Sequence, residues 1–295
     1  MTLQQLLDRS QDRLEAAGLV YGHGTTNARD EAAWLVLWSL GLPLDSDLEA
    51  VGSQVLLPAQ VSDAEALIER RIASRQPAAY LTREAWLQGV PFYVDERAIV
   101  PRSFIAELIA DGGFDAWLGE DTRRVLDLCT GNGSLAVLAA MAWPEVRVTG
   151  ADLSPDALAV ARINVDRHGL QDRITLVESD GLAACPGPWD LVLCNPPYVN
   201  AESMDALPPE FRAEPALALA GGADGMDFVR ALLRDLPSRL SPQGVLVLEI
   251  GHERPHFEAA FPQLEVVWLT TSAGDDQVLL LTAEALRAHA ASQPV

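Results

Sequence analysis

The stretch RRVLDLCTGNG, residues 123–133, decides the fold class. Its apolar run is typical of a buried strand, and Gly131 and Gly133 permit a tight turn before the helical pattern SLAVLAAMAWP. Strand and helix patterns then alternate along the chain. Strands are expected at 146–153, 174–180, 189–198 and 244–251, and helices at 154–169 and 226–240. This alternation predicts a parallel, doubly wound α/β sheet.

Two more strand patterns close the chain, LEVVWLT (264–270) and QVLLLTA (277–283). Only TSAGDD joins them, and this segment is too short for a helix that crosses the sheet. We therefore expect an antiparallel pair of strands at the C-terminal end of the sheet.

A small helical region precedes the sheet. Its expected helices span 2–18, 27–41 and 62–75. Ser62 and Glu65 have the spacing of a capping box for the third helix. Trp34, Leu35 and Trp38 share one face of the second helix, where packing is expected rather than a ligand surface.

The segment EAWLQGVPFYVDERAIVPR (84–102) is predicted to contain a short β-hairpin around Gly89. It marks the domain boundary. The expected organisation is a helical domain at 1–83, a hairpin linker at 84–102 and an α/β domain at 103–295.

Bulk composition narrows the class of protein. The 295 residues are 49% apolar, enough for a substantial core, yet no apolar run has the ~20 residues of a membrane helix. The first residues, MTLQQLLDRSQDRLEAAG, carry acids and do not resemble a signal peptide. The chain has three cysteines, Cys129, Cys185 and Cys194. Their number is odd and their spacing does not resemble that of a metal site, so reduced thiols in the cytoplasm are expected.

The formal net charge is −21. Nucleic-acid binders usually carry a basic patch, and the densest basic stretch here, RRIASR (70–75), closes an expected helix. Direct nucleic-acid readout is therefore not expected, nor is membrane binding. The acidity fits a basic partner, or it serves solubility alone.

The glycine loop DLCTGNG (127–133) suits an adenosine-containing ligand. Gly131 and Gly133 allow the ligand to approach the backbone closely. Asp152 ends the next strand, where a carboxylate can accept both ribose hydroxyls. Asp180 ends the strand after that and could meet the adenine.

Two cofactors compete for this loop. GNGSLA is a fair match to the dinucleotide pattern, and the spacing to Asp152 also fits NAD. Asp127 argues against NAD, because a carboxylate repels a pyrophosphate but attracts an ammonium or sulfonium group. The antiparallel strand pair and the motif at 195–198 also favour S-adenosylmethionine.

That motif is Asn195–Pro196–Pro197–Tyr198, at the end of an apolar strand. A planar nitrogen, such as an amide or an adenine amino group, is a poor nucleophile. The Asn195 side-chain carbonyl and the Pro196 main-chain carbonyl could each accept one N–H and aim the lone pair at a methyl carbon. Prolines fix the backbone, and Tyr198 could stack on the planar group. No general base is required.

DLCTGNGSLA, ADLSPDAL and NPPYV together resemble the N5-glutamine methyltransferases, a class I family that uses S-adenosylmethionine and releases S-adenosylhomocysteine. VPR at 100–102 and EPALALAGGADGMDFVR at 214–230 carry the resemblance over nearly the whole chain. It implies a Rossmann-like class I methyltransferase sheet, preceded by a helical domain that recognises the protein substrate. Family members methylate a glutamine of release factors or of a large-subunit ribosomal protein.

The resemblance also implies roles for individual residues. Those expected to catalyse by holding the target amide are Asn195, Pro196, Pro197 and Tyr198. Those expected at the cofactor are Asp127, Thr130, Gly131, Asn132, Gly133, Asp152, Leu153, Asp180, Asn195 and Glu107. No metal is expected, because His252 and His256 lack a third ligand and Pro255 argues against a helix joining them.

Arg102–Ser103 discriminates between the two branches. Release-factor enzymes typically continue Pro-Arg with Pro-Glu-Thr-Glu, whereas the ribosomal branch usually has Arg-Ser-Pro; here Phe104 stands in place of that Pro. The expected partner is ribosomal protein L3, with release factors as the alternative. A nucleic-acid amino methyltransferase and a module that binds S-adenosylmethionine without transfer are the remaining rivals.

Overall fold

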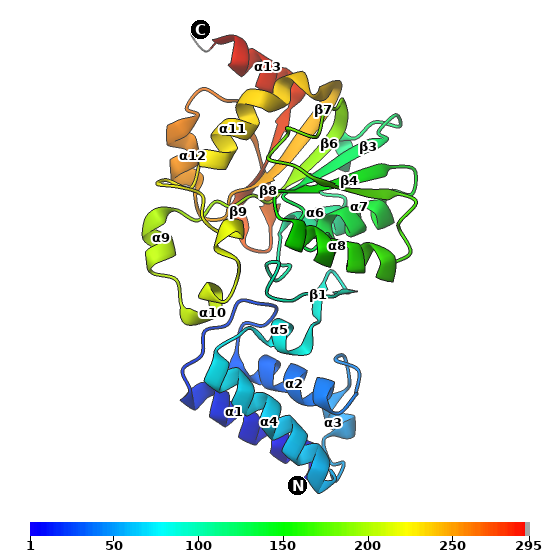
Figure 1. Cartoon of the computed structure of the whole chain (residues 1–295), viewed down its shortest axis with the longest axis vertical. Coiled ribbons are helices and arrows are strands. Elements are labelled where there is room, and N and C mark those ends of the chain that lie inside the picture. The colour runs from blue at the N-terminus through cyan, green and yellow to red at the C-terminus, as the bar shows by residue number, and fades with distance from the viewer. Residues whose placement is uncertain (293–295) are drawn as a thin grey trace.

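The computed structural model describes residues 1–292, and places an α/β body and a set of N-terminal helices one above the other along the long axis (Figure 1). Seven strands form the main sheet in the order β5-β4-β3-β6-β7-β9-β8. Their bounds are β3 Arg124–Leu128, β4 Arg147–Asp152, β5 Ile174–Glu178, β6 Trp189–Cys194, β7 Leu240–Glu249, β8 Val267–Thr271 and β9 Gly274–Thr282.

The directions of the strands confirm the predicted sheet. Strands β5, β4, β3, β6 and β7 pair in parallel, and β9 pairs antiparallel with both β7 and β8. The segment between β8 and β9 is too short to cross the sheet, so the two strands it joins are antiparallel, as predicted.

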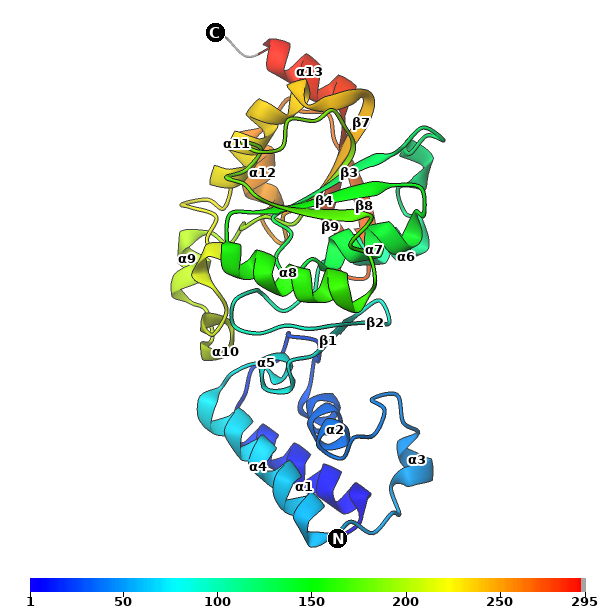
Figure 2. The same ribbon diagram turned by 45° about the vertical axis from the view of Figure 1, so that its right-hand side comes forward.

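Helices cover both faces of the sheet, so its central strands are apolar without alternation. In β6, Leu191 and Leu193 pack on one side, and Val192 and Cys194 on the other. Figure 2 shows α6, α7 and α8 on one side and α11, α12 and α13 on the other. These helices are α6 Ile105–Asp111, α7 Ser134–Ala142, α8 Pro155–Arg167, α11 Asp227–Asp235, α12 Arg254–Ala260 and α13 Ala283–Ser292.

Shorter elements lie in the connections. They are α9 Ala201–Asp205, α10 Pro209–Arg212, and the 3-10 turns η1 Asp115–Trp117, η2 Ala216–Ala218 and η3 Leu236–Ser238. Within residues 1–292, no helix has the length and apolar character needed to cross a membrane.

The N-terminal helices have their own apolar cores. They are α1 Leu3–Ala16, α2 Ala28–Ser39, α3 Leu48–Val51, α4 Pro58–Ser74 and α5 Ala78–Thr82. Trp34 and Leu35 are buried as expected, whereas Trp38 on the same helix remains 39% exposed.

The predicted start of the third long helix is wrong. Helix α4 begins at Pro58, and Ser62 lies inside it, so Ser62 and Glu65 form no capping box. Pro58 suits the first turn because its missing N–H would have no helical partner there. The Gln60 side chain instead accepts the N–H of Leu57, at 2.9 Å.

The predicted hairpin is confirmed, with β1 Ala85–Leu87 antiparallel to β2 Val90–Phe92. The chain that follows it is fastened to α8. The Asn164 side chain accepts the N–H of Tyr93 at 2.7 Å and donates to the Tyr93 carbonyl at 2.9 Å. The same amide donates to the Asn132 carbonyl at 2.8 Å, so it joins the linker to the glycine loop.

A buried ion pair joins two of the N-terminal helices. Arg71 Nε of α4 donates to Glu31 Oε1 of α2 at 2.8 Å, and both side chains are almost fully buried. Thr25 donates to the other oxygen of Glu31 at 3.1 Å. Removing one member of such a pair leaves an uncompensated buried charge.

Replacing Arg71 by leucine should therefore lower the free energy of unfolding by about 3–5 kcal/mol. The matched control is Arg9→Leu, which breaks a partly exposed pair with Glu65 and should cost less than about 1 kcal/mol. Urea unfolding followed by tryptophan fluorescence measures both. Equal losses in the two variants would contradict the assigned role of the buried pair.

Candidate active site

A cavity of about 310 Å³ lies where β3, β4 and β6 reach the same edge of the sheet. Parallel α/β sheets bind ligands at this edge, next to the ends of their strands. Six of the residues expected from the sequence line this cavity: Gly131, Asp152, Leu153, Asp180, Asn195 and Pro197. The structure therefore brings together residues at the ends of four strands, β3, β4, β5 and β6.

Asp152 is the most firmly held carboxylate in the cavity wall. Its Oδ2 accepts the N–H of Gly131 at 2.8 Å, and its Oδ1 accepts the N–H of Ser154 at 2.9 Å. Burial raises the pKa of Asp152 despite these donors. Each oxygen keeps a lone pair, so the group can still accept hydroxyls from a ligand.

Asp127 lies beneath the glycine loop rather than in the cavity wall. It is 1% exposed, and its Oδ2 accepts from Thr130 Oγ1 at 2.5 Å and from the N–H of Ala136 at 2.9 Å. It thereby fixes the loop to the first turn of α7. Among the described residues, Asp127 Oδ1 and Asn132 Nδ2 are buried without a hydrogen-bond partner.

The two loop glycines have backbone conformations that other residues rarely adopt. Gly131 has φ 55° and Gly133 has φ 81°. A Cβ at Gly133 would also lie 3.1 Å from Ala161 Cβ of α8. Only glycine therefore lets the loop close on α8.

The motif at 195–198 divides between two environments. Asn195 and Pro197 line the cavity, and Pro196 is buried. The Tyr198 hydroxyl points toward Glu249 at the end of β7, with 3.4 Å between its oxygen and Glu249 Oε1. Burial, followed by the Glu249 charge, raises the pKa of Tyr198.

Three glycines that sequence reasoning did not assign to the site surround Tyr198. A Cβ at Gly221 would lie 2.7 Å from Tyr198 Cα, and one at Gly251 would lie 2.5 Å from its Cε2. A Cβ at Gly225 would collide with the Tyr198 carbonyl oxygen. The sequence around these glycines carries no local signal of the role, because the contacts with Tyr198 are distant along the chain.

Glu214 begins the stretch 214–230, whose sequence carries part of the family resemblance. Arg102 donates to both of its oxygens, at 2.6 and 2.8 Å, and the N–H of Val100 donates at 2.9 Å. His23 Nε2 lies 3.3 Å from its second oxygen. Burial opposes ionisation, but the Arg102 charge and the His23 and Arg102 contacts lower the pKa of Glu214 to about 2.

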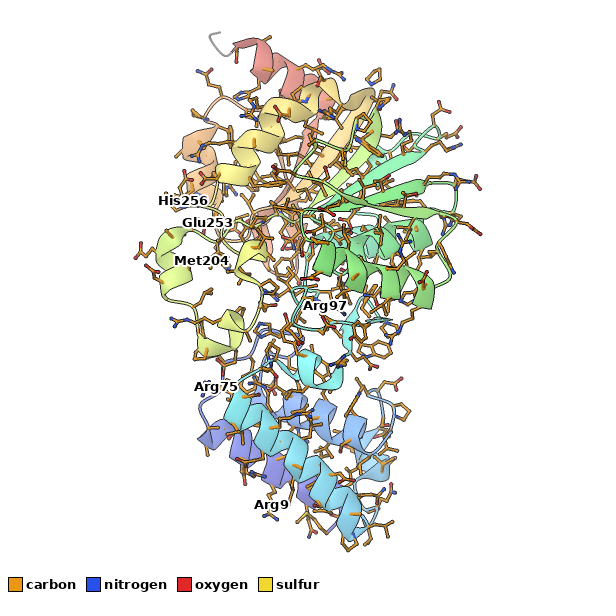
Figure 3. All side chains as sticks on the ribbon, in the orientation of Figure 1. Arg9, Arg75, Arg97, Met204, Glu253 and His256 are labelled. Atoms are coloured by element: carbon orange, nitrogen blue, oxygen red, sulfur yellow. The ribbon has the colours of Figure 1, made fainter. Side chains whose placement is uncertain are left out.

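The loop that carries α9 and α10 lies between the α/β body and the N-terminal helices (Figure 1). Arg75, at the end of α4, forms an ion pair with buried Glu210 at 2.7 Å (Figure 3). The N–H of Val20 donates to the same carboxylate at 3.2 Å. The loop after Tyr198 is therefore anchored to the N-terminal helices.

Arg97 also lines the cavity, and Figure 3 places it below α8. It forms an ion pair with Asp95 at 2.6 Å, and its hydrogen bonds lower the pKa of Asp95 to about 2. Sequence reasoning missed Arg97, since its position in the linker carried no recognisable signal.

Several expected site residues lie away from the cavity. Thr130, Asn132 and Gly133 are buried within the loop and are not among the described residues that line it. Glu107 is on α6 and accepts from Ser272 N at 2.9 Å and Ser272 Oγ at 2.6 Å, so the structure does not bring it to the cavity either.

The two histidines of GHERPH do not share a helix. Helix α12 begins at Arg254 with Pro255 in its first turn, and His252 precedes it, so no helix joins the two histidines, as Pro255 indicated. His256 Nδ1 lies 2.5 Å from Glu253 Oε2. No group of three or more His, Cys, Asp or Glu side chains suited to a metal occurs within residues 1–292.

The fold and cavity define a methyltransferase of the α/β class. The methyltransferase small domain family matches residues 116–222, the stretch that runs from before β3 through the motif at 195–198. The fold is similar to a crystal structure of the hMettl16 catalytic domain in complex with the MAT2A 3'UTR hairpin 6. The TM-score is 0.52 over 78% of this chain and 84% of that chain, at 14% identity, which is a likeness of fold alone.

Relatives define the family more narrowly. The chain is 54% identical to the ribosomal protein uL3 glutamine methyltransferase of Bordetella pertussis, over 97% of this chain and 96% of that protein. It is 51% identical to the one from Burkholderia pseudomallei, over 98% and 97%. The chain belongs to the family of ribosomal protein uL3 glutamine methyltransferases. The family and branch indicated by the sequence motifs are thus confirmed.

Phe104, which replaces the usual proline of this branch, is accommodated without distortion. It precedes α6 with φ −69°, a value that proline also adopts. Its N–H donates to Glu249 Oε2 at 2.9 Å, a bond that proline could not make.

The buried carboxyl of Asp127 should make the free energy of unfolding depend on pH. Burial raises its pKa from 3.8 to about 7. Because the fold favours the protonated form, the carboxyl contributes stability below pH 3.8 that is lost as the pH rises through 7. Relative to Asp127→Asn, the wild-type free energy of unfolding should fall by up to about 4 kcal/mol between about pH 4 and pH 8.

Urea unfolding of both proteins at a series of pH values measures this difference. Asp156→Asn, which changes an exposed aspartate at the start of α8, is the control and should show a much smaller dependence. A constant difference between wild type and Asp127→Asn across the pH range would refute the assignment.

Proposed function

We propose that this protein transfers a methyl group from S-adenosylmethionine to the side-chain amide nitrogen, N5, of a glutamine in ribosomal protein L3 (uL3). The observation that carries the proposal is the position of Asn195, which lines the same cavity as Asp152 and Asp180. The residue expected to bind the amide and the residue expected to bind the ribose therefore line one cavity. The names of the nearly full-length relatives supply the substrate.

The cavity suits an adenosine-containing cofactor. Its volume, about 310 Å³, falls in the range of small-molecule sites, and its walls combine apolar surface with a few polar groups. Asp152 would accept the ribose hydroxyls, Leu153 would cover the adenine, and Asp180 would meet the edge of the base. The glycine loop, fixed from beneath by Asp127, would hold the methionine part. S-adenosylmethionine supplies a methyl group on a sulfonium, which makes that carbon electrophilic.

The chain's own contribution to transfer is orientation. The Asn195 side-chain oxygen and the Pro196 carbonyl would each accept one N–H of the glutamine amide. Both bonds strengthen as the nitrogen becomes tetrahedral and more positive. The fixed φ of Pro196 and Pro197 keeps these acceptors in place before the substrate arrives. The proton then leaves to water.

The charge of the chain is consistent with this partner. Ribosomal proteins bind a polyanionic RNA and are basic as a class, and the formal net charge here is −21. Attraction between the two would raise the rate of encounter at low salt. The helical region at 1–83 would recognise the protein substrate. We place the enzyme in the cytoplasm, with no nucleic-acid or membrane partner.

Transfer of labelled methyl from S-adenosylmethionine tests the substrate. Unmethylated L3, a release factor, bulk RNA and bulk DNA are offered separately, and peptide mass spectrometry locates the added mass. Label is expected on one glutamine of L3. Label on the release factor alone would overturn the choice of substrate, and label on nucleic acid alone would overturn the amide chemistry.

Replacing Asn195 by alanine should lower kcat by about 10²–10³-fold, because one preorganised acceptor of the amide is lost. Binding of S-adenosylmethionine, measured by calorimetry, should persist. Asn200→Ala is the matched control, since the Asn200 side chain bonds Ser203 and Glu253 and should change kcat only a few-fold. Wild-type activity in Asn195→Ala with cofactor still bound would eliminate the amide-clamp mechanism.

A further inference from the structure

We propose that Ser103 and Glu249 are positioning residues for methyl transfer, because they hold Tyr198 and with it the segment that receives the amide. The inference rests on the proposed function and deepens it. It gives Ser103 a role in the site. In the sequence, Ser103 served only to distinguish the ribosomal-protein branch of the family from the release-factor branch.

Glu249 is the centre of this arrangement. It ends β7, the strand next to β6, and is 2% exposed. Ser103 Oγ donates to Glu249 Oε2 at 2.6 Å, and the N–H of Phe104 donates to the same oxygen at 2.9 Å. One carboxylate oxygen is thereby fixed by the start of α6.

The other oxygen of Glu249 faces the target-binding motif. Glu249 Oε1 lies 3.4 Å from the Tyr198 hydroxyl. Because Ser103 and Phe104 set the orientation of the carboxylate, they also set where Oε1 points. Ser103 is thus linked to Tyr198 by two successive hydrogen bonds, both of which are made to the Glu249 carboxylate.

Tyr198 has little room to move in other directions. Its ring lies against the backbone of Gly251, and its main chain lies against Gly221 and Gly225. The N–H of Val199 donates to Leu219 O at 2.8 Å, and the N–H of Gly221 donates to Val199 O at 2.8 Å. The tyrosine is therefore packed around its backbone and ring, and Glu249 is the polar group that fixes its hydroxyl end.

The segment is short, so a shift of Tyr198 is transmitted to the amide acceptors. Pro196 is separated from Tyr198 only by Pro197, and two prolines in succession cannot absorb a rotation about φ. Small misplacements of positioned groups lower transfer rates strongly. Loss of the Ser103 hydroxyl should therefore act on kcat rather than on cofactor binding.

The test compares Ser103→Ala with Ser272→Ala. Each substitution removes a serine hydroxyl that donates to a glutamate at 2.6 Å, but Ser272 bonds Glu107 of α6 instead of Glu249. Ser103→Ala is expected to lower kcat about 10-fold with the KM for S-adenosylmethionine unchanged, and Ser272→Ala to leave both unchanged. Ser103→Cys leaves no cavity and has only a weak donor, so it should also lose activity; urea unfolding of each variant shows whether it is folded.

A double substitution separates positioning from a general structural effect. In a Tyr198→Phe background, which lacks the hydroxyl, Ser103→Ala should lower kcat less than about 2-fold further. Losses that multiply would show that Ser103 acts independently of Tyr198 and would overturn the inference. Equal activity of Ser103→Ala and Ser272→Ala would overturn it as well.

A spectroscopic measurement keeps the inference separate from the proposed function. The protein is labelled with fluorotyrosine, and the resonance of Tyr198 is assigned by its absence in Tyr198→Phe. Ser103→Ala should move this resonance, and Ser272→Ala should not. If the wild type methylates no glutamine, the proposed function fails, and the fluorine shift alone then decides the inference; an unmoved Tyr198 resonance would overturn it.

Discussion

The contact on which the arrangement of the molecule depends is the buried carboxylate of Glu214. It lies 3.3 Å from His23 of the N-terminal region and accepts hydrogen bonds from Val100 and Arg102 of the linker. Glu214 itself belongs to the loop that follows Tyr198. Three parts of the chain, distant in sequence, therefore meet at one charge. Because the guanidinium of Arg102 forms a bidentate ion pair with Glu214, the contact fixes the orientation of the two side chains as well as their distance.

Three buried carboxylates near the cavity differ in what compensates their charge. Glu214 has a cation beside it, so its pKa falls to about 2. Asp127 and Glu249 are surrounded by neutral donors, and burial raises the pKa of each to about 7. The first is a fixed charge at neutral pH, and it links the linker to the loop that follows Tyr198. The other two lie near the balance between charged and neutral forms, beneath the cofactor loop and behind Tyr198.

Much of the fold and half of the site follow from local sequence. Strand runs, the glycine loop and the acid at the end of β4 each have a signal within a few residues, and Asp152 lies where that signal predicts. The start of α4 was misread because Pro58 and Gln60 cap it in place of Ser62. The residue roles that were missed depend on long-range contacts.

Gly225 and Gly251 illustrate why those contacts could not be predicted. In sequence each is a glycine after an apolar run or in a loop, typical of an ordinary turn. Their requirement for glycine comes from Tyr198, which is brought beside them only when β6 and β7 pair. Glu107 shows the opposite error, because a carboxylate near the expected site bonds Ser272 instead.

The proposed cofactor-binding half and the proposed target-binding half of the site are thus supported in different ways. The cofactor half is held by bonds within a loop and its neighbouring strand, from Asp127 and Asp152 to backbone N–H groups. The target half is held by Glu249 and three glycines from distant segments, and its following loop is anchored to the N-terminal helices through Glu210 and Glu214. A change of target can therefore be made in the second set of contacts without disturbing the first. This separation accounts for a cofactor cavity that is recognisable from short motifs beside a target site whose supports are visible only in the folded chain.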